Sequence, residues 1–426
     1  MLRSSHHLID PNKSSNTFGD LSLHENGLNL FTNAGNGGLL KIGLEELPDN
    51  FRVVLRKPFF KKLLLEGKSK TGLWKELART IRLDYTSLVD LRNGETKSIS
   101  LAVLKTLVLI TKIPLEEAEK NCLFEYRSWG KPIRIPINPS PELASLVAHA
   151  LGDGSIGERS FQVEYKNNNF ECMKDVLSAV KKVFGVNASS RNEKNALVTT
   201  LPAAVGQVLF LAGATKGNKT KKDFDVPEWI KNGTRTIKQS FLRALFDDEG
   251  SVYIGKKSSN IKLYMGKLAS KKDSLVKFLN SIRQMLEDFG IKSRGVITLR
   301  EYRVKNQEKL MLGFWITGKR NLKLFAKKIG LNTVKQKKLE MAISSYKYDM
   351  WGEEVEDEIL RVLCMEGPKK TSELVKGIAR DRTSLLKHLH RLEANKKISS
   401  SRYELANGLY GFRWYTNTMA GGEENG

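Results

Sequence analysis

The stretch "FLRALFDDEGSV" (Phe241–Val252) places three carboxylates at the end of an apolar run. Asp247, Asp248 and Glu249 come directly before Gly250, where a helix is expected to end. The C-terminus of a helix carries partial negative charge and favours Lys or Arg, so three acids there oppose the helix dipole and repel one another. The stretch therefore indicates that a positive group belongs beside it.

A second stretch, "LVAHALGDGSI" (Leu146–Ile156), has the same form, and aligning the two places Asp153 on Glu249. Small side chains at helical spacing let two helices approach closely. We therefore expect the helices before the two acids to lie side by side and to bring Asp153 and Glu249 together at their ends. The small residues concerned are Ala144, Ala148, Gly152 and Ala244.

One pattern of elements surrounds each stretch. The predicted order is helix, two strands, helix, two strands and helix, first over about residues 140–230 and again over residues 231–348. Apolar residues follow helical spacing in "FECMKDVLSAVKKVF" and alternate in "IKLYMGK", as this order requires. The prediction for residues 140–348 is an α+β fold of two αββαββα repeats.

Composition points to a polyanionic partner. The 426 residues include 71 Lys and Arg against 47 Asp and Glu, a formal net charge of +24. So large a surplus favours nucleic acid over a surface charged only for solubility. We expect no membrane partner, because no apolar run approaches the roughly 18 residues of a membrane span. Three scattered cysteines favour the reducing cytoplasm and indicate neither a disulfide framework nor a zinc site.

The paired acids favour a metal site. Two carboxylates at the centre of a basic chain are costly unless a cation neutralises them. Oxygen-only ligands select hard divalent ions, here Mg²⁺ or Mn²⁺, and such ions beside a phosphate activate water and stabilise the leaving oxygen. Turn or capping acids are the alternative, which one motif alone would favour. The recurrence of Asp153 and Glu249 in the same context favours a metal site aimed at a phosphodiester.

The motifs "LVAHALGDG" and "LRALFDDEG" resemble the two signature motifs of LAGLIDADG homing endonucleases in the single-chain, two-repeat form. The resemblance spans roughly residues 140–348. It implies a monomer with pseudo-two-fold symmetry, whose two sheets form a saddle over double-stranded DNA. It also implies that Asp153 and Glu249 bind the metal ions and take part in a staggered double-strand cut.

Two departures from the family's motif fall at the helix ends. His149 and Leu151 stand where Leu and Asp are common, and Asp248 stands where a small residue is usual. Neither departure removes a metal-binding acid. We expect His149 and Asp248 to face the interface between the helices rather than the phosphate.

The resemblance also assigns a basic residue after each repeat's last helix, near the scissile phosphate. "KGNKTKK" and "NTVKQKK" occupy these places. We assign Lys219 and Lys335 as catalytic, with Lys221 and Lys337 as near alternatives. A general surface that contacts phosphate is an equally good interpretation of all four lysines.

The saddle strands are expected to contact DNA. "KLYMGK" and "GVITLREYRV" alternate polar with apolar residues, as a strand with one face on a core and one on a partner must. The candidates for base or phosphate contact are Lys262, Arg294, Arg300 and Arg303.

Residues 46–125 are predicted to be an all-α domain that follows a disordered tail at residues 1–45. A helix near residues 73–81, a short turn and a helix at residues 85–92 resemble the helix-turn-helix of Cro/repressor-type proteins. The resemblance places Tyr85 and Arg92 on the DNA-contacting helix, while Arg82 stands in the turn where Gly is common. A plain three-helix bundle is the alternative. Proline-rich residues 126–139 are predicted to be an extended linker.

Residues 351–418 resemble a winged helix, with three helices and a strand hairpin, and a disordered tail is expected at residues 419–426. The longest of these helices, "ARDRTSLLKHLHRLEANKK", is basic, and Lys387 is its candidate DNA contact.

Three functions stay open. The first is a site-specific DNA endonuclease. The second is a transcription regulator that keeps the LAGLIDADG fold and binds DNA without cutting it. The third is an RNA-splicing maturase. The retained acids favour the endonuclease, because a domain used only for binding does not need paired carboxylates facing phosphates.

Overall fold

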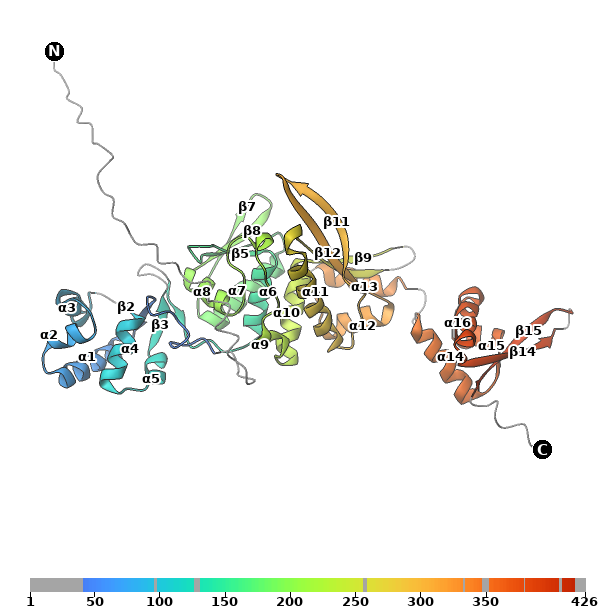
Figure 1. Cartoon of the computed structure of the whole chain (residues 1–426), viewed down its shortest axis with the longest axis horizontal. Helices are drawn as coiled ribbons and strands as arrows, with labels where there is room; N and C mark the ends of the chain where they lie inside the picture. Colours follow the sequence, from blue (N-terminus) through green and yellow to red (C-terminus); the bar gives the residue numbers. More distant parts are fainter. Residues whose placement is uncertain are drawn as a thin grey trace, which may run out of the picture. The chain divides into compact units, whose positions relative to one another are not determined.

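The structure is a computed structural model of the chain (Figure 1). It describes residues 41–95, 98–125, 131–255, 259–331, 334–346, 352–378, 380–405 and 408–417. Most of the predicted N-terminal tail and all of the predicted C-terminal tail lie outside these residues. Within them, no helix is both long and apolar enough to cross a membrane.

The N-terminal segment combines helices with a small antiparallel sheet of order β2-β1-β3-β4. The all-α prediction for residues 46–125 was therefore wrong, because strands of two to four residues are too short to show a recognisable alternation. The predicted helices at residues 73–81 and 85–92 are confirmed as α2 and α3. The elements are β1 (Arg52–Leu55), α1 (Lys57–Thr71), α2 (Trp74–Thr80), α3 (Tyr85–Asn93), β2 (Ser98–Ser100), α4 (Leu101–Thr111), α5 (Leu115–Lys120), β3 (Cys122–Glu125) and β4 (Ile133–Arg134).

The turn between α2 and α3 depends on Arg82. Its φ is 54°, in the left-handed region that glycine usually occupies. Asp84 then begins α3, because its carboxylate accepts a hydrogen bond from the Ser87 backbone N–H at 2.8 Å. Arg82 thus supplies the tight turn in spite of its side chain.

The predicted linker at residues 126–139 is not an exposed spacer where the structure describes it. Ile133, Ile135 and Ile137 are buried, and β4 pairs with β3. Ile137 also bridges to Ile42, which belongs to the predicted tail and is buried together with Leu44. The prediction was wrong because prolines favour an extended spacer, whereas the isoleucines between them alternate as in a strand with one buried face.

The central residues 141–328 contain two halves with the same order of elements (Figure 1). Their antiparallel sheets have the orders β5-β6-β8-β7 and β9-β10-β12-β11. The first half comprises α6 (Pro141–Leu151), β5 (Gly154–Ile156), β6 (Val163–Asn167), α7 (Phe170–Phe184), β7 (Ser190–Glu193), β8 (Ala196–Leu201) and α8 (Ala203–Leu211). The second comprises α10 (Arg235–Asp248), β9 (Gly250–Tyr253), β10 (Asn260–Leu268), η3 (Ala269–Lys271), α11 (Lys272–Glu287), β11 (Ile297–Val304), β12 (Gln307–Thr317) and α12 (Lys319–Lys328). The short helices η2 (Lys219–Lys221) and α9 (Glu228–Lys231) connect them, and α13 (Val334–Ser344) follows.

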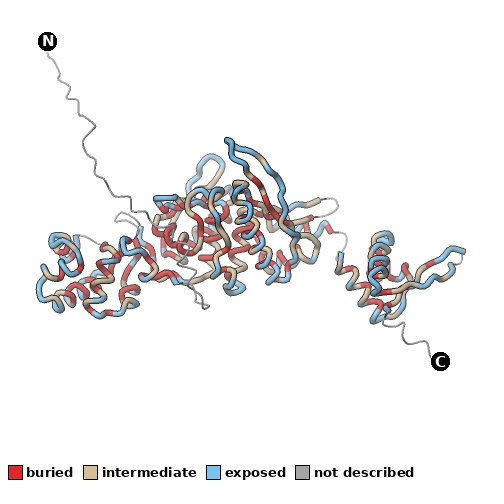
Figure 2. The backbone as a smooth tube through the Cα atoms, viewed as in Figure 1, coloured by how far each residue is buried: buried red, intermediate tan, exposed pale blue. Residues whose placement is uncertain are grey.

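Helices α6 and α10 pack against each other at the centre of this region. Ala144, Ala148 and Ala244 are all buried there, as their size requires at a close helix crossing. Gly152 ends α6 directly against the side chain of Asp248. The hairpin β11–β12 differs, because almost all of β11 is exposed (Figure 2).

The C-terminal segment has its own core. Trp414 is fully buried among apolar side chains from its helices, and its indole N–H donates to the Thr371 hydroxyl at 3.0 Å. The three strands lie in the order β13-β15-β14. The winged-helix assignment stays a prediction. The elements are α14 (Glu353–Glu366), β13 (Lys369–Lys370), α15 (Thr371–Gly377), α16 (Arg382–Ala394), β14 (Ile398–Glu404) and β15 (Tyr410–Thr416).

We expect Gly152→Ala to lower the free energy of unfolding by about 1–3 kcal/mol, the usual cost of overpacking a buried site. A methyl group at Gly152 would lie 2.7 Å from Asp248 Oδ2. The control is Gly295→Ala, because nothing lies within 4 Å of its added methyl. Denaturant unfolding measures both variants, and equal losses would contradict the close crossing.

Candidate active site

The C-terminal ends of α6 and α10 bring together Asp153 and Glu249, the two acids expected from the repeated motif. Partial burial, followed by the charge of Asp248, raises the pKa of Asp153. Burial, followed by repulsion from Asp153, raises the pKa of Glu249 to about 7. The two carboxylates therefore share one electrostatic site in which a cation would favour their charged forms.

The side chain of Asp248 is enclosed, with 0% of it exposed. Its Oδ2 accepts a hydrogen bond from the Asp153 backbone N–H at 3.3 Å and lies 3.0 Å from His149 Nδ1. Its Oδ1 accepts from the Tyr165 hydroxyl at 2.8 Å. Asp248 thus lies in the helix interface, as expected, and both of its oxygens are occupied there.

Buried His149 is the partner of Asp248 across the interface. Burial lowers the pKa of His149, but the charge and hydrogen bond of Asp248 outweigh it, and the net shift is upward. A His–Asp pair in the interface satisfies two polar groups that would be costly to bury alone.

Asn167 connects this interface to Asp153. Its Nδ2 donates to Asp153 Oδ2 at 2.9 Å and to the Tyr165 hydroxyl at 3.0 Å. Asn167 Oδ1 accepts from the Asn169 backbone N–H at 2.8 Å, which fixes the orientation of the amide. Among the described residues, no hydrogen bond holds the Glu249 carboxylate in this way.

Tyr165 and Asn167 were not predicted as site residues from the sequence. A signal was present, because both residues lie on the same face of β6 as buried Val163. A polar residue at the end of the apolar face of a strand is a candidate for a role in a site.

Lys219 lies on η2 at the end of α6. Its amino group donates to the carbonyls of Leu151 at 3.1 Å and Gly154 at 2.7 Å, and also to those of Ala150 and Gly152. Burial lowers the pKa of Lys219, and the charges of Glu249 and Asp153 oppose that shift.

Lys335 occupies the corresponding place at the end of α10. Its amino group donates to the carbonyls of Phe246 at 3.3 Å, Asp247 at 2.5 Å and Gly250 at 2.6 Å. Lys219 and Lys335 are thus the positive groups that the acidic helix ends require. Both are half-buried, whereas the alternatives Lys221 and Lys337 are exposed. A catalytic role for Lys219 and Lys335 stays a prediction.

The donor set suits a hard divalent ion. Asp153 and Glu249 offer carboxylate oxygens, and a cation would offset both the burial and the repulsion that raise their pKa values. Within the described residues, no group of three or more His, Cys, Asp or Glu is arranged to hold a metal ion. An ion here would therefore take its remaining ligands from water or from an anionic partner.

The predicted strand contacts lie on the second sheet or beside it. Arg300 and Arg303 are exposed on β11, where Arg303 pairs with Glu308 at 2.8 Å. Lys262, on β10, lies 4.7 Å from the ring centre of Tyr253. Arg294 is exposed just before β11, and its backbone N–H donates to the carbonyl of Trp315 in β12 at 2.8 Å, so its contact with DNA stays a prediction.

The other predicted contacts lie in the flanking segments rather than among the residues around the acids. Tyr85 is exposed at the first turn of α3, and Lys387 is exposed on α16. Arg92, at the end of α3, lies 5.5 Å from the centre of the Trp74 ring.

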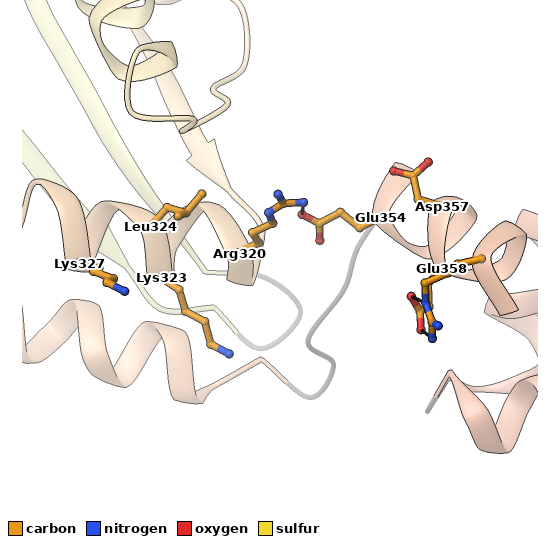
Figure 3. A pocket seen from close by; sticks show the side chains of 8 residues that line it. Arg320, Lys323, Leu324, Lys327, Glu354, Asp357 and Glu358 are labelled. Carbon is orange, nitrogen blue, oxygen red and sulfur yellow. Dashed lines mark hydrogen bonds and ion pairs between the residues drawn. The ribbon is translucent and has the colours of Figure 1, made fainter. Parts of the chain in front are cut away.

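A hollow between α12 and α14 differs in character from the site of the two acids (Figure 3). Basic side chains of α12 and acidic side chains of α14 line it, and Arg320 lies 3.6 Å from Glu354 in an ion pair. Opposite charges on its walls neutralise each other, whereas Asp153 and Glu249 place like charges together.

Residues 236–330 match the family model of the LAGLIDADG-like domain. This match covers the second half of the central region, from α10 to α12.

Two curated relatives have unrelated names. The chain is 28% identical over 225 residues to a tRNA-splicing ligase RtcB of Methanopyrus kandleri, covering 48% of this chain and 22% of the relative. It is 25% identical over 289 residues to a glutamine–fructose-6-phosphate aminotransferase of Methanocaldococcus jannaschii, covering 67% of this chain and 25% of the relative. The chain thus spans about a quarter of the length of these relatives.

Two solved structures are weakly similar. The homing endonuclease I-WcaI bound to its DNA recognition sequence is 15% identical, with a TM-score of 0.31, over 47% of this chain and 87% of that one. The N-terminal LAGLIDADG domain of DUF199/WhiA is 17% identical, with a TM-score of 0.29, over 45% of this chain and 82% of that one. Neither value supports an argument about function.

We expect Lys219→Met and Lys335→Met each to lower the free energy of unfolding by about 1–3 kcal/mol, because each leaves helix-end carbonyls without a donor. The controls Lys221→Met and Lys337→Met remove the same charge from exposed neighbours, and they should stay within about 0.5 kcal/mol. Chemical denaturation measures all four variants. Equal losses in both pairs would attribute the effect to net charge instead.

Proposed function

We propose that this protein is a site-specific DNA endonuclease that makes a metal-dependent, staggered double-strand cut. The pairing of Asp153 with Glu249 at the ends of two packed helices carries the proposal. The LAGLIDADG-like match at residues 236–330 supports it. In this proposal, residues 140–348 form a two-repeat unit that works as a monomer.

Mg²⁺ or Mn²⁺ would be held by Asp153 and Glu249, and a bound ion supplies an activated water and charge stabilisation at the leaving oxygen. Other residues of the chain set the ionisation and the orientation of these acids. The charges of Lys219 and Lys335 favour the ionised form of both carboxylates and so oppose the effect of burial. Asn167 orients one oxygen of Asp153.

The names of the curated relatives support no activity here. A ligase and an aminotransferase catalyse unrelated reactions, and the chain matches a quarter or less of each. A segment shared by two such proteins cannot account for both activities. The proposed function therefore rests on the site itself.

Double-stranded DNA is the proposed partner. The exposed strand β11 of the β11–β12 hairpin carries Arg300 and Arg303, and the major groove of B-DNA admits a two-stranded ribbon. The deep, narrow groove of an RNA duplex does not, which makes an RNA-splicing maturase the weaker alternative. We also propose that the segments carrying α3 and α16 bind DNA as a helix-turn-helix and a winged helix.

One observation favours a regulator that binds DNA without cutting it. Of the four carboxylates at the helix ends, Asp248 is fully engaged within the interface and Asp247 is buried, which leaves Asp153 and Glu249 for an ion. If two acids do not suffice, the same surfaces would bind DNA and leave it intact.

Both acids should be needed for cleavage. With Mg²⁺, Asp153→Asn and Glu249→Gln should each abolish double-strand cutting, because each removes a charge from the metal site while keeping its shape. Binding should persist or tighten, because a negative charge facing phosphates is gone. A supercoiled plasmid bearing the target tests this, with EDTA as the control. Tight binding by the wild-type protein without any cutting in Mg²⁺ or Mn²⁺ would support the regulator instead.

Binding should depend steeply on salt, and α16 should contribute to the slope. Each neutralised phosphate of duplex DNA adds about −0.9 to the slope of log K against log salt. Lys387→Gln should therefore make the slope shallower by about 0.9. The matched control is Lys376→Gln, which removes an exposed charge from α15. Fluorescence anisotropy at several salt concentrations measures both, and identical slopes would show that Lys387 does not contact phosphate.

A further inference from the structure

The two acids have different surroundings although the backbone repeats. A closed ring of hydrogen bonds holds Asp153. Asp248 Oδ1 accepts from the Tyr165 hydroxyl, which accepts from Asn167 Nδ2, and the same Nδ2 donates to Asp153 Oδ2. The Asp153 backbone N–H closes the ring on Asp248 Oδ2. Asp153 is thus fixed through both its backbone and its carboxylate.

Strand register identifies the corresponding positions in the second half. Gly154 pairs with Tyr165 in the first sheet, and Gly250 pairs with Leu263 in the second. Counting two residues along each strand places Met265 where the first half has Asn167. Leu263 and Met265 are buried and apolar, so they cannot donate to Glu249 as Tyr165 and Asn167 do toward Asp153.

The helix ends are also unequal. Gly152 occupies the α6 position that corresponds to Asp248 on α10, and the space left by the missing side chain is filled by Asp248 itself. Asp248 therefore reaches across the interface and serves the acid of the other half. A second such ring around Glu249 would need an aspartate in place of Gly152. That aspartate would collide with Asp248, which fills the space that Gly152 leaves.

We propose that Asn167, supported by Tyr165 and Asp248, is a positioning residue for Asp153 alone, and that the two metal-binding acids are therefore functionally unequal. This inference rests on the proposed endonuclease function. Partners that orient a metal ligand are typically worth 10–100-fold in metal affinity or activity when removed. Loss of Asn167 should therefore impair the site served by Asp153 and spare the one served by Glu249.

The first test measures Mn²⁺ binding by titration calorimetry, with the protein alone and with its DNA target. Asn167→Leu keeps the approximate shape of Asn167 and removes its donor, so Mn²⁺ affinity should fall about tenfold. The controls are Asn168→Ala, at an exposed neighbour, and Met265→Leu, at the corresponding position of the second half. Both controls should bind Mn²⁺ like the wild-type protein.

The second test follows each DNA strand. A plasmid labelled separately on its two strands should accumulate nicked circles with Asn167→Leu, and all of the breaks should lie in one strand. A variant that was merely less stable would slow both strands equally. Should Asn167→Leu not fold, Tyr165→Phe removes a single hydroxyl from the ring and should show the same strand bias, with a smaller loss of Mn²⁺ affinity.

The outcomes separate the two proposals. Unchanged Mn²⁺ affinity or equal slowing of both strands, in a preparation whose wild-type protein binds Mn²⁺ and cuts, overturns the role of Asn167 and leaves the endonuclease intact. A wild-type protein that neither binds Mn²⁺ nor cuts overturns the endonuclease and this inference together.

Discussion

The close approach of α6 and α10 is the constraint on which the site depends. Alanine and glycine at the crossing allow the two helices to meet, and the meeting brings together two helix ends and two carboxylates of like charge. Such a junction is unfavourable without compensation. The amino groups of Lys219 and Lys335 supply part of this compensation, because each donates hydrogen bonds to the carbonyls of one helix end. The two acids can therefore stay close together with no change in the backbone.

The sequence was sufficient to predict the order of helices and strands in the central region and to identify its two acids. The helix "FECMKDVLSAVKKVF" has the same bounds in the structure as in the prediction, because its apolar spacing is regular and Asn169 caps its first turn. Asp153 and Glu249 were found because their motif occurs twice, and a repeat carries information that a single acidic turn lacks.

Other features depended on neighbours that a linear pattern does not identify. The strands of the N-terminal sheet are too short to show a period, and their partners lie far along the chain. Asp248 was expected in the helix interface, but its three partners could not be named. Tyr165 and His149 stand 83 and 99 residues from it in sequence, and only the crossing of α6 and α10 brings them together.

The unequal hairpins have a consequence for orientation. Strands β7 and β8 have 4 and 6 residues, whereas β11 and β12 have 8 and 11. Although the order of elements repeats, the two halves of the central region are therefore not equivalent. Any long partner that contacts both hairpins meets a short arm on one side and a long arm on the other, so it is held with a defined polarity. For the proposed DNA partner, a palindromic sequence would gain nothing from such a surface, whereas a sequence with distinct left and right halves would fit it.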